Sequence, residues 1–284
     1  MKNMAMKNLA IVKMLGIIFF ALSCGGAWAA NPLQQELLKN IKQNAQEKIT
    51  GKPAITREEE IAIGRQIAGN LLGAAPLVKD AKLQKYINQV GRWIADQSER
   101  PDLAWHFGVI EASDVNAFAA PGGYIFVTRG LYQTLRSEAE LAGVLGHEIG
   151  HVIRQHHLKI LQQSKLLDLG SQHLVKKVGG NEKVQGLIGS GAEIASRALD
   201  KDAEYEADRI AVVLSARAGY DAFGLPAVLQ QLGHVAKDEG NVTLLFKTHP
   251  HPDDRLDKLG SIMDERFDKV RGKTLEKRLY RIAK

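Results

Sequence analysis

The run His147-Glu148-Ile149-Gly150-His151 places two imidazoles and a carboxylate at helical spacing. Residues four apart on an α-helix differ by about 40° around its axis, so His147 and His151 share a face and offer two nitrogens to one cation. Glu148 is rotated by about 100° from His147, beside a metal-held water molecule instead of on the metal. A carboxylate in that place takes a proton from water that Zn²⁺ has made acidic. The spacing therefore predicts zinc-assisted hydrolysis of a peptide bond.

The residues before this run favour a built site over two histidines on a surface helix. Residues 141–146 read Leu-Ala-Gly-Val-Leu-Gly, so the helix is apolar as it enters the motif. Gly146 and Gly150 add no side-chain bulk and allow close approach of other backbone or of substrate.

A catalytic zinc needs a third protein ligand and an open position. A histidine stands at 157, but the pattern that would make it a ligand requires glycine at 154, which is arginine. Glu204 and Asp208 are four apart and share a helix face, so Glu204 could bind zinc while Asp208 bonds a ligating histidine. An exposed acidic helix face is the commoner reason for such spacing, and these residues alone do not decide. Glu206 points about 200° away from Glu204.

Three motifs together resemble the prenyl-protease, HtpX and Oma type of zinc metallopeptidases, which are gluzincins. They are the His-Glu-x-x-His run, Glu204-x-x-Ala-Asp208, and His249-Pro250 with Arg255 six residues after the histidine. The upstream run Asn116-Ala-Phe-Ala-Ala-Pro-Gly-Gly is also similar to the family. The resemblance covers about residues 55–265 and is strongest toward bacterial envelope members that lack membrane spans.

The resemblance implies a role for each matching residue. It implies one Zn²⁺ per chain, with His147, His151 and Glu204 as ligands and Glu148 as base and acid. Asp208 would bond a ligating histidine.

His249 would lie near the metal, where some family members use this histidine to occupy the open position and restrain activity. The alternative for His249 is a turn residue beside prolines. Arg255 would lie near the cleft and act in catalysis. His156, His157 and His251 have no such match and are expected at the surface.

The segment from Asn116 to Ala119 (Asn116, Ala117, Phe118 and Ala119) is expected at the edge of a sheet. Exposed edge backbone pairs with an extended peptide, which would bring a substrate carbonyl to the zinc and select unfolded segments. An ordinary edge strand is the alternative.

The fold class predicted is α+β and mainly helical, with a gluzincin-type core and a small sheet beside the His-Glu-x-x-His helix. Thr56 and Glu59 form a capping-box pattern at a helix start. Strands are expected at about 105–111 and Tyr124–Thr128, with Pro121-Gly122-Gly123 as a turn between paired strands. Helices are expected at 33–48, from Thr56, at 79–97, from Ser137 through His151, and at 202–217. Residues 160–200 have helical period broken by glycines and are expected to form a hairpin or lid.

The first 29 residues follow the layout of a secretory signal peptide. Lys2, Lys7 and Lys13 precede an apolar run, which ends before the small residues around Ala27-Trp28-Ala29. The expected organisation is a signal peptide at 1–29, a helical segment at 30–55 and a zinc metallopeptidase domain at 56–284. Two alternatives remain, an uncleaved membrane anchor or a lipid anchor on Cys24, the only cysteine.

Composition limits the function classes. Hydrophobic residues make up 45% and charged residues 25%, which are values of a globular protein and not of a disordered or polytopic membrane protein. The net charge of +6 is spread among acids with no basic block, so no nucleic-acid partner is expected, whereas weak peripheral contact with an anionic membrane is compatible with it. A structural zinc module is disfavoured, because such sites are rich in cysteine.

The leading hypothesis is a zinc metalloendopeptidase of the bacterial periplasm that degrades unfolded or misfolded envelope proteins. The alternative is a chaperone-like envelope protein with a closed, low-activity zinc site. The intact Glu148 favours catalysis, since a pure binder needs no base.

Overall fold

The computed structural model describes residues 55–168, 199–235 and 242–282. These residues, from Thr56 onward, belong to one compact unit that extends to Lys284. The expected signal peptide at 1–29, the helix at 33–48 and most of the segment at 160–200 lie outside the described residues, so no lid is described here.

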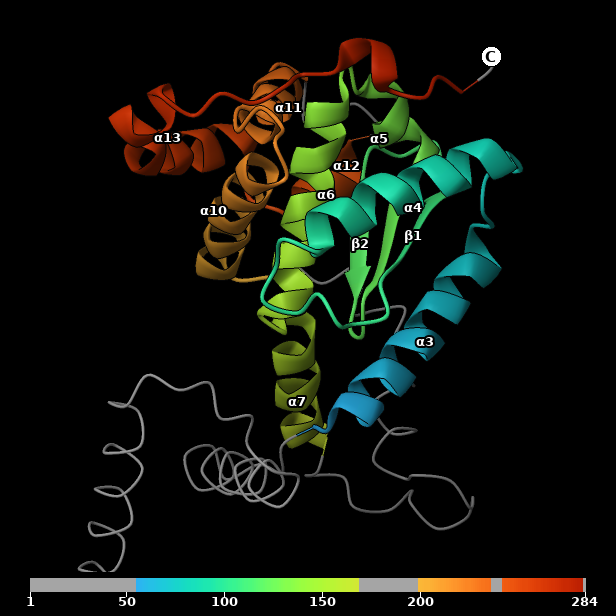
Figure 1. Ribbon diagram of the computed structural model, residues 1–284. Helices are drawn as coiled ribbons and strands as arrows, with labels where there is room; N and C mark the ends of the chain where they lie inside the picture. The colour runs from blue at the N-terminus through green and yellow to red at the C-terminus, as the bar shows by residue number, and fades with distance from the viewer. Residues whose placement is uncertain (1–54, 169–198, 236–241, 283–284) are drawn as a thin grey trace, which may run out of the picture. The chain divides into compact units, whose positions relative to one another are not determined.

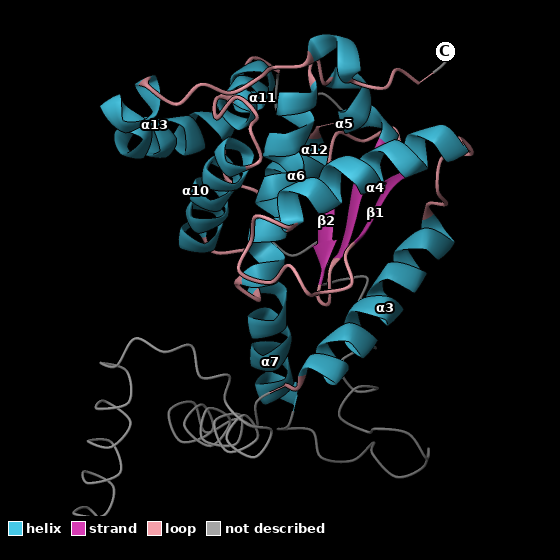
Figure 2. Ribbon diagram, viewed as in Figure 1, coloured by secondary structure: helices cyan, strands magenta, loops and turns pink. Residues whose placement is uncertain are grey.

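Helices surround one small sheet, as the sequence predicts (Figures 1 and 2). The described helices and strands, in chain order, are α3 (Arg57–Ala74), α4 (Ala81–Ala95), β1 (His106–Ile110), β2 (Ala117–Ala120), β3 (Tyr124–Thr128), α5 (Arg129–Thr134), α6 (Glu138–Ile153), α7 (His156–Asp168), α10 (Lys201–Arg217), α11 (Gly224–Gly233), α12 (Thr243–Thr248), α13 (Pro252–Asp268) and the short 3-10 helix η1 (Glu276–Arg278).

The strand order is β1-β3-β2, with β1 parallel to β3 and β2 antiparallel to it. The turn between β2 and β3 passes through Gly122 and Gly123 with φ of 77° and 96°, a backbone region that side chains other than glycine rarely adopt. The turn at Pro121-Gly122-Gly123 is therefore confirmed, but it joins β3 to β2, which stands at an edge of the sheet, and not to the strand expected at 105–111. The parallel pairing of β1 with β3 was not anticipated.

Helix α6 runs through the middle of the domain (Figure 1). Ser137 caps it by accepting a hydrogen bond from the Glu140 backbone N–H, and every residue from Glu138 to Val152 is buried. Helices α10 and α11 pack on one side of α6, and α4 and strand β2 contact it on the other. The motif helix is therefore a core element, and its polar side chains are enclosed by protein.

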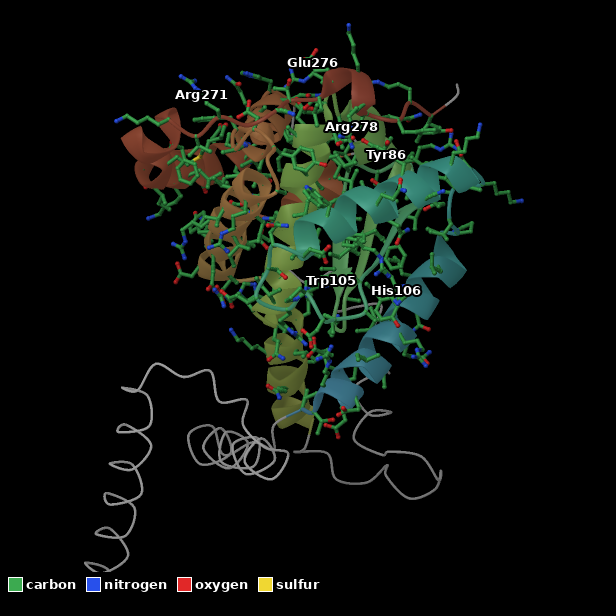
Figure 3. All side chains as sticks on the ribbon, viewed as in Figure 1. Tyr86, Trp105, His106, Arg271, Glu276 and Arg278 are labelled. Atoms are coloured by element: carbon green, nitrogen blue, oxygen red, sulfur yellow. The ribbon has the colours of Figure 1, made fainter. Side chains whose placement is uncertain are left out.

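The first turn of α6 also carries a buried acid, Glu138. The hydroxyls of Tyr86 and Tyr220 donate to its carboxylate at 2.8 and 2.9 Å, and Arg278 pairs with it at 3.1 Å. Tyr86 comes from α4 and Arg278 from η1, both labelled in Figure 3. The carboxylate sits at the positive end of the helix dipole, which stabilises its charge. Its contacts also connect α4 and the C-terminal segment to the start of α6.

Glycines let α10 and α11 approach α6 closely. A Cβ built on Gly146 would lie 3.0 Å from the Ala211 Cα atom, and one on Gly150 would lie 3.1 Å from the Ala207 Cα atom. A Cβ built on Gly143 would lie only 2.5 Å from the Leu225 backbone nitrogen. The backbone of α11 thus rests directly on α6 at that point.

We expect Gly143→Ala to lower the free energy of unfolding by about 1–3 kcal/mol, because the added methyl group meets backbone that cannot move cheaply. This loss exceeds the gain of up to about 1 kcal/mol that alanine brings to a helix. The control is Gly69→Ala in α3, where a Cβ meets nothing within 4 Å and stability should stay equal or rise. Denaturant melts of both variants measure the difference, and equal stability would contradict the packing described.

Candidate metal centre

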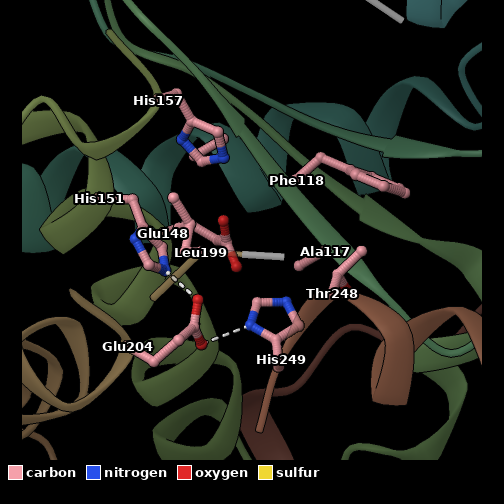
Figure 4. Close-up of a pocket in the computed structure, with 10 residues that line it drawn as sticks. Ala117, Phe118, Glu148, His151, His157, Leu199, Glu204, Thr248 and His249 are labelled. Atoms are coloured by element: carbon pink, nitrogen blue, oxygen red, sulfur yellow. Dashed lines mark hydrogen bonds and ion pairs between the residues drawn. The ribbon is translucent and has the colours of Figure 1, made fainter. Parts of the chain in front are cut away.

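Four side chains converge on one point from α6, α10 and the end of α12, and Figure 4 shows His151, Glu204 and His249 among them. His147, His151, Glu204 and His249 each offer a ligand atom, and these atoms lie within 4.8 Å of one another. The His147 and His151 Nε2 atoms face each other at 2.9 Å. The Glu204 carboxylate is 3.6 Å from the His147 Nε2 atom and 3.5 Å from that of His151. The sequence-predicted ligand positions are therefore adjacent in space.

The donors fit a divalent metal. Two imidazole nitrogens and a carboxylate oxygen form a common protein donor set for zinc. The Glu204 Oε1 atom is buried and makes no hydrogen bond to any described residue. Because a buried carboxylate oxygen without a partner costs free energy, a cation between this oxygen and the two facing Nε2 atoms would compensate it.

The charge states of Glu204 and His151 suit a cation, whereas His147 would first have to lose a proton. Burial alone would raise the pKa of Glu204, but His249 and His147 outweigh it and hold the pKa well below its usual range. Burial lowers the pKa of His151, which leaves its imidazole neutral. Burial and Arg255 lower the pKa of His147, but hydrogen bonds to Asp208 and Glu204 raise it to about 9. A metal that binds His147 at neutral pH therefore displaces a proton.

Asp208 and Arg255 act on His147 from the side away from the cluster. The Asp208 Oδ1 atom lies 2.8 Å from the His147 Nδ1 atom, and Arg255 donates to Asp208 at 2.9 and 2.6 Å through its Nε and Nη2 atoms. Burial raises the pKa of Asp208, but the Arg255 guanidinium outweighs it and brings the pKa to about 2. Asp208 thus stands where the sequence places it, and Arg255 contacts His147 both through this carboxylate and directly, with its Nη2 atom 3.2 Å from the His147 Nδ1 atom.

Glu148 and His249 border two pockets. One is a cleft that also contacts the edge strand β2 and is bordered by Phe118, labelled in Figure 4. Burial raises the pKa of Glu148, which increases its affinity for a proton. The other pocket has mainly apolar walls from Leu131, Val144, Leu225, Val228, Leu229, Leu232 and Leu245.

Three of the four residues expected to form the edge strand line the cleft, and the fourth, Asn116, is buried. Ala117, Phe118 and Ala119 line the cleft. Asn116 precedes β2 and is fully buried, and its side-chain Oδ1 atom accepts a hydrogen bond from the Ala117 backbone N–H at 3.0 Å.

The expectation that His156 and His157 lie at the surface is wrong. His156 is 4% exposed, with its Nδ1 atom 2.9 Å from that of His151, and His157 lines the cleft. The reason is that the chain turns sharply at Gln155, where φ is 55°, and α7 starts by bringing both rings back over α6. Neither proline nor glycine marks this turn in the sequence. His251 caps α13 instead, with 23% of its side chain exposed.

A family model, peptidase family M48, matches residues 81–263. The β-barrel assembly-enhancing protease of Yersinia pestis is 29% identical over 231 residues, 78% of this chain and 46% of that protein. The protein of the same name from Escherichia coli K12 is 30% identical over 207 residues, 70% of this chain and 42% of that protein. The mitochondrial metalloendopeptidase OMA1 of Arabidopsis thaliana is 30% identical over 175 residues, 61% of this chain and 35% of that protein.

The chain spans less than half the length of each of these three relatives. The family match nevertheless covers more than half of this chain and includes α6 and α10, which carry His147, His151 and Glu204. The chain therefore belongs to peptidase family M48, and its described domain is a metallopeptidase domain.

Proposed function

We propose that this protein is a zinc-dependent endopeptidase that hydrolyses peptide bonds in unfolded or misfolded proteins of the bacterial envelope. One observation carries the proposal. The buried Glu148 stands between the edge strand β2 and a cluster of His147, His151 and Glu204, in which one carboxylate oxygen accepts no hydrogen bond from the described residues. Base, metal site and a peptide-binding edge thus meet in one cleft.

His147, His151 and Glu204 would hold one Zn²⁺ ion. When bound, this ion supplies Lewis-acid chemistry by making water acidic and polarising a peptide carbonyl. Glu148 takes the proton from the attacking water and later gives it to the leaving amine, so one carboxylate serves as base and then as acid. Its buried position, which raises its pKa, favours this proton uptake.

The edge strand and the apolar pocket support an extended substrate. Strand β2 pairs with β3 on one side only, and a peptide in the cleft would add to its other side by backbone hydrogen bonds. Backbone pairing selects segments that are not already paired, which are those of unfolded proteins. The pocket walled by Val144, Leu229 and Leu232 would receive an apolar side chain next to the scissile bond.

The envelope location rests on the N-terminal sequence and on two relatives. Residues 1–29 have the layout of a signal peptide, and two similar proteins are named for the enhancement of β-barrel assembly. Cleavage after Ala29 would release the enzyme into the periplasm, whereas lipidation of Cys24 would hold it at a membrane. In the part of the chain that the structure describes, every helix is too short or too polar to cross a membrane.

His249 favours a second candidate, a restrained or closed site. Its Nδ1 atom lies 2.6 Å from the Glu204 Oε2 atom and inside the four-residue cluster. A fourth protein ligand closes a zinc site as in structural zinc centres. We propose that His249 competes with the catalytic water, so that the resting enzyme is slow. A permanently closed site would make the protein a chaperone-like binder.

We expect Glu148→Gln to keep zinc and fold while it lowers cleavage of unfolded casein at least about 100-fold, because the amide cannot take a proton. Metal analysis and circular dichroism beside the protease assay check the variant. A zinc-loaded variant with substantial cleavage would remove Glu148 from its role as base.

Glu204→Ala should lose zinc, since it removes one of three ligands from the cluster. The control is Asp202→Ala on the same helix, because Asp202 is exposed and does not belong to the four-residue cluster. Zinc per chain is measured after loading in excess and gel filtration. Equal zinc content in the two variants would mean that Glu204 is not the ligand.

His249→Ala should raise the turnover of an unfolded substrate several-fold, because the open position no longer has a competing imidazole. If His249 instead stabilises the oxyanion, turnover should fall while zinc content stays full. Steady-state kinetics at saturating zinc separate these results. Unchanged kinetics with unchanged metal affinity would return His249 to the role of a turn residue.

A further inference from the structure

A series of polar side-chain contacts begins at His151, and the proposed catalytic roles do not use it. Its Nδ1 atom lies 2.9 Å from the Nδ1 atom of His156, and the His156 Nε2 atom lies 3.3 Å from the Glu206 Oε2 atom. The other Glu206 oxygen lies 3.0 Å from the Nε atom of Arg154. These contacts lead without a break from His151 in the metal cluster, through His156, to Glu206 on α10.

Geometry separates His156 from the metal ligands. The group of four residues that could share a metal does not include it. Its ring meets the Nδ1 side of His151, whereas the Nε2 atom of His151 faces His147 and Glu204. His156 therefore acts on His151 and not on the ion.

With a neutral His156, one arrangement of hydrogens satisfies this line of contacts. The Glu206 carboxylate, paired with Arg154, accepts, so the His156 Nε2 atom carries the hydrogen that faces it. A neutral His156 then has a bare Nδ1 atom, which accepts from the Nδ1–H group of His151. That tautomer leaves the His151 Nε2 lone pair free to bind a metal.

We propose that His156 and Glu206 are positioning residues that fix the ring orientation and tautomer of His151 for zinc. This inference rests on the proposed zinc site. It assigns to His151 the kind of support that His147 receives from Asp208. In each case the far carboxylate is held by an arginine, Arg255 for Asp208 and Arg154 for Glu206.

The backbone conformation just before His156 supports the proposal that this residue is held in a fixed position. Gln155, just before it, has a φ of 55°, a left-handed conformation that is unfavourable for a residue other than glycine. The Gln155 side chain donates to the Glu60 Oε2 atom at 3.1 Å, and Arg100 pairs with Glu60 at 2.9 Å. A strained turn persists where its surroundings hold it, and such turns gather at functional sites. Here the turn inserts an imidazole against a metal ligand.

The experiment compares two substitutions at His156 in the full-length protein, with Zn²⁺ and Co²⁺ as probes. Phenylalanine keeps a ring of similar shape but removes both nitrogens. Glutamine can accept from His151 and donate to Glu206 through its amide. We expect His156→Phe to weaken zinc about 10- to 100-fold in a chelator competition and to change the visible spectrum of bound Co²⁺. His156→Gln should stay within about threefold of the parent, since the loss is due to the polar contacts.

The matched control is His106→Phe, because His106 stacks on Tyr124 away from the cluster, and zinc affinity should not change. Zinc affinity of His156→Phe within threefold of the parent, or equal losses in the Phe and Gln variants, would overturn the proposal. If His156→Phe does not fold, Glu206→Ala decides instead. That variant should weaken zinc more than twofold with unchanged melting of the metal-free protein, and unchanged affinity would overturn the proposal. A parent protein that binds no zinc would reject the metal site itself.

Discussion

The close packing of α10 on α6 is the contact on which the rest of the site depends. Gly146 and Gly150 are four residues apart on α6, and Ala207 and Ala211 are four apart on α10, so the two helices meet along a strip of small residues. A glutamate side chain is short, and its carboxylate reaches a metal between two histidines only if the helices lie close. Larger residues along this strip would move Glu204 and Asp208 away from His147 together. The glycines of the motif helix therefore determine the geometry of the site as much as its histidines do.

The close packing of α10 on α6 also buries several ionisable side chains next to one another. Glu148, Glu204, Asp208 and Arg255 are all buried within one region of the core. Buried charges are tolerated when they are paired, and removing one partner leaves the other uncompensated. Asp208 and Arg255 compensate each other, whereas one Glu204 oxygen accepts no hydrogen bond from the described residues and lies 3.5 Å from the His151 Nε2 atom. The fold thus places a buried carboxylate beside two imidazole nitrogens, a donor set that suits a cation.

The helices were predictable from the sequence because their signals are local. Thr56 and Glu59 form the expected capping box, Ser137 caps the motif helix, and the spacing of His147 and His151 is a property of any helix. The roles of Glu204 and Asp208 were open until the motifs were taken together, since a carboxylate pair on a helix does not reveal what it faces. Contacts across the fold were not encoded locally. The burial of His156 depends on a left-handed turn at Gln155, a residue type that does not favour it, and the parallel pairing of β1 with β3 depends on chain topology.

The origin of each cluster member argues for an enzyme with a restraint and against a closed structural site. Three members, His147, His151 and Glu204, come from α6 and α10, two helices that pack closely on each other and so hold these residues in place. His249 comes instead from the C-cap of the six-residue helix α12, in extended backbone between that helix and the start of α13. Its side chain remains 10% exposed, whereas that of Glu204 is fully buried. A ligand at the end of a short helix can leave while three ligands on packed helices retain the metal. This arrangement supports the restraint proposed for His249, because a purely structural site gains nothing from one weakly held ligand beside a buried carboxylate.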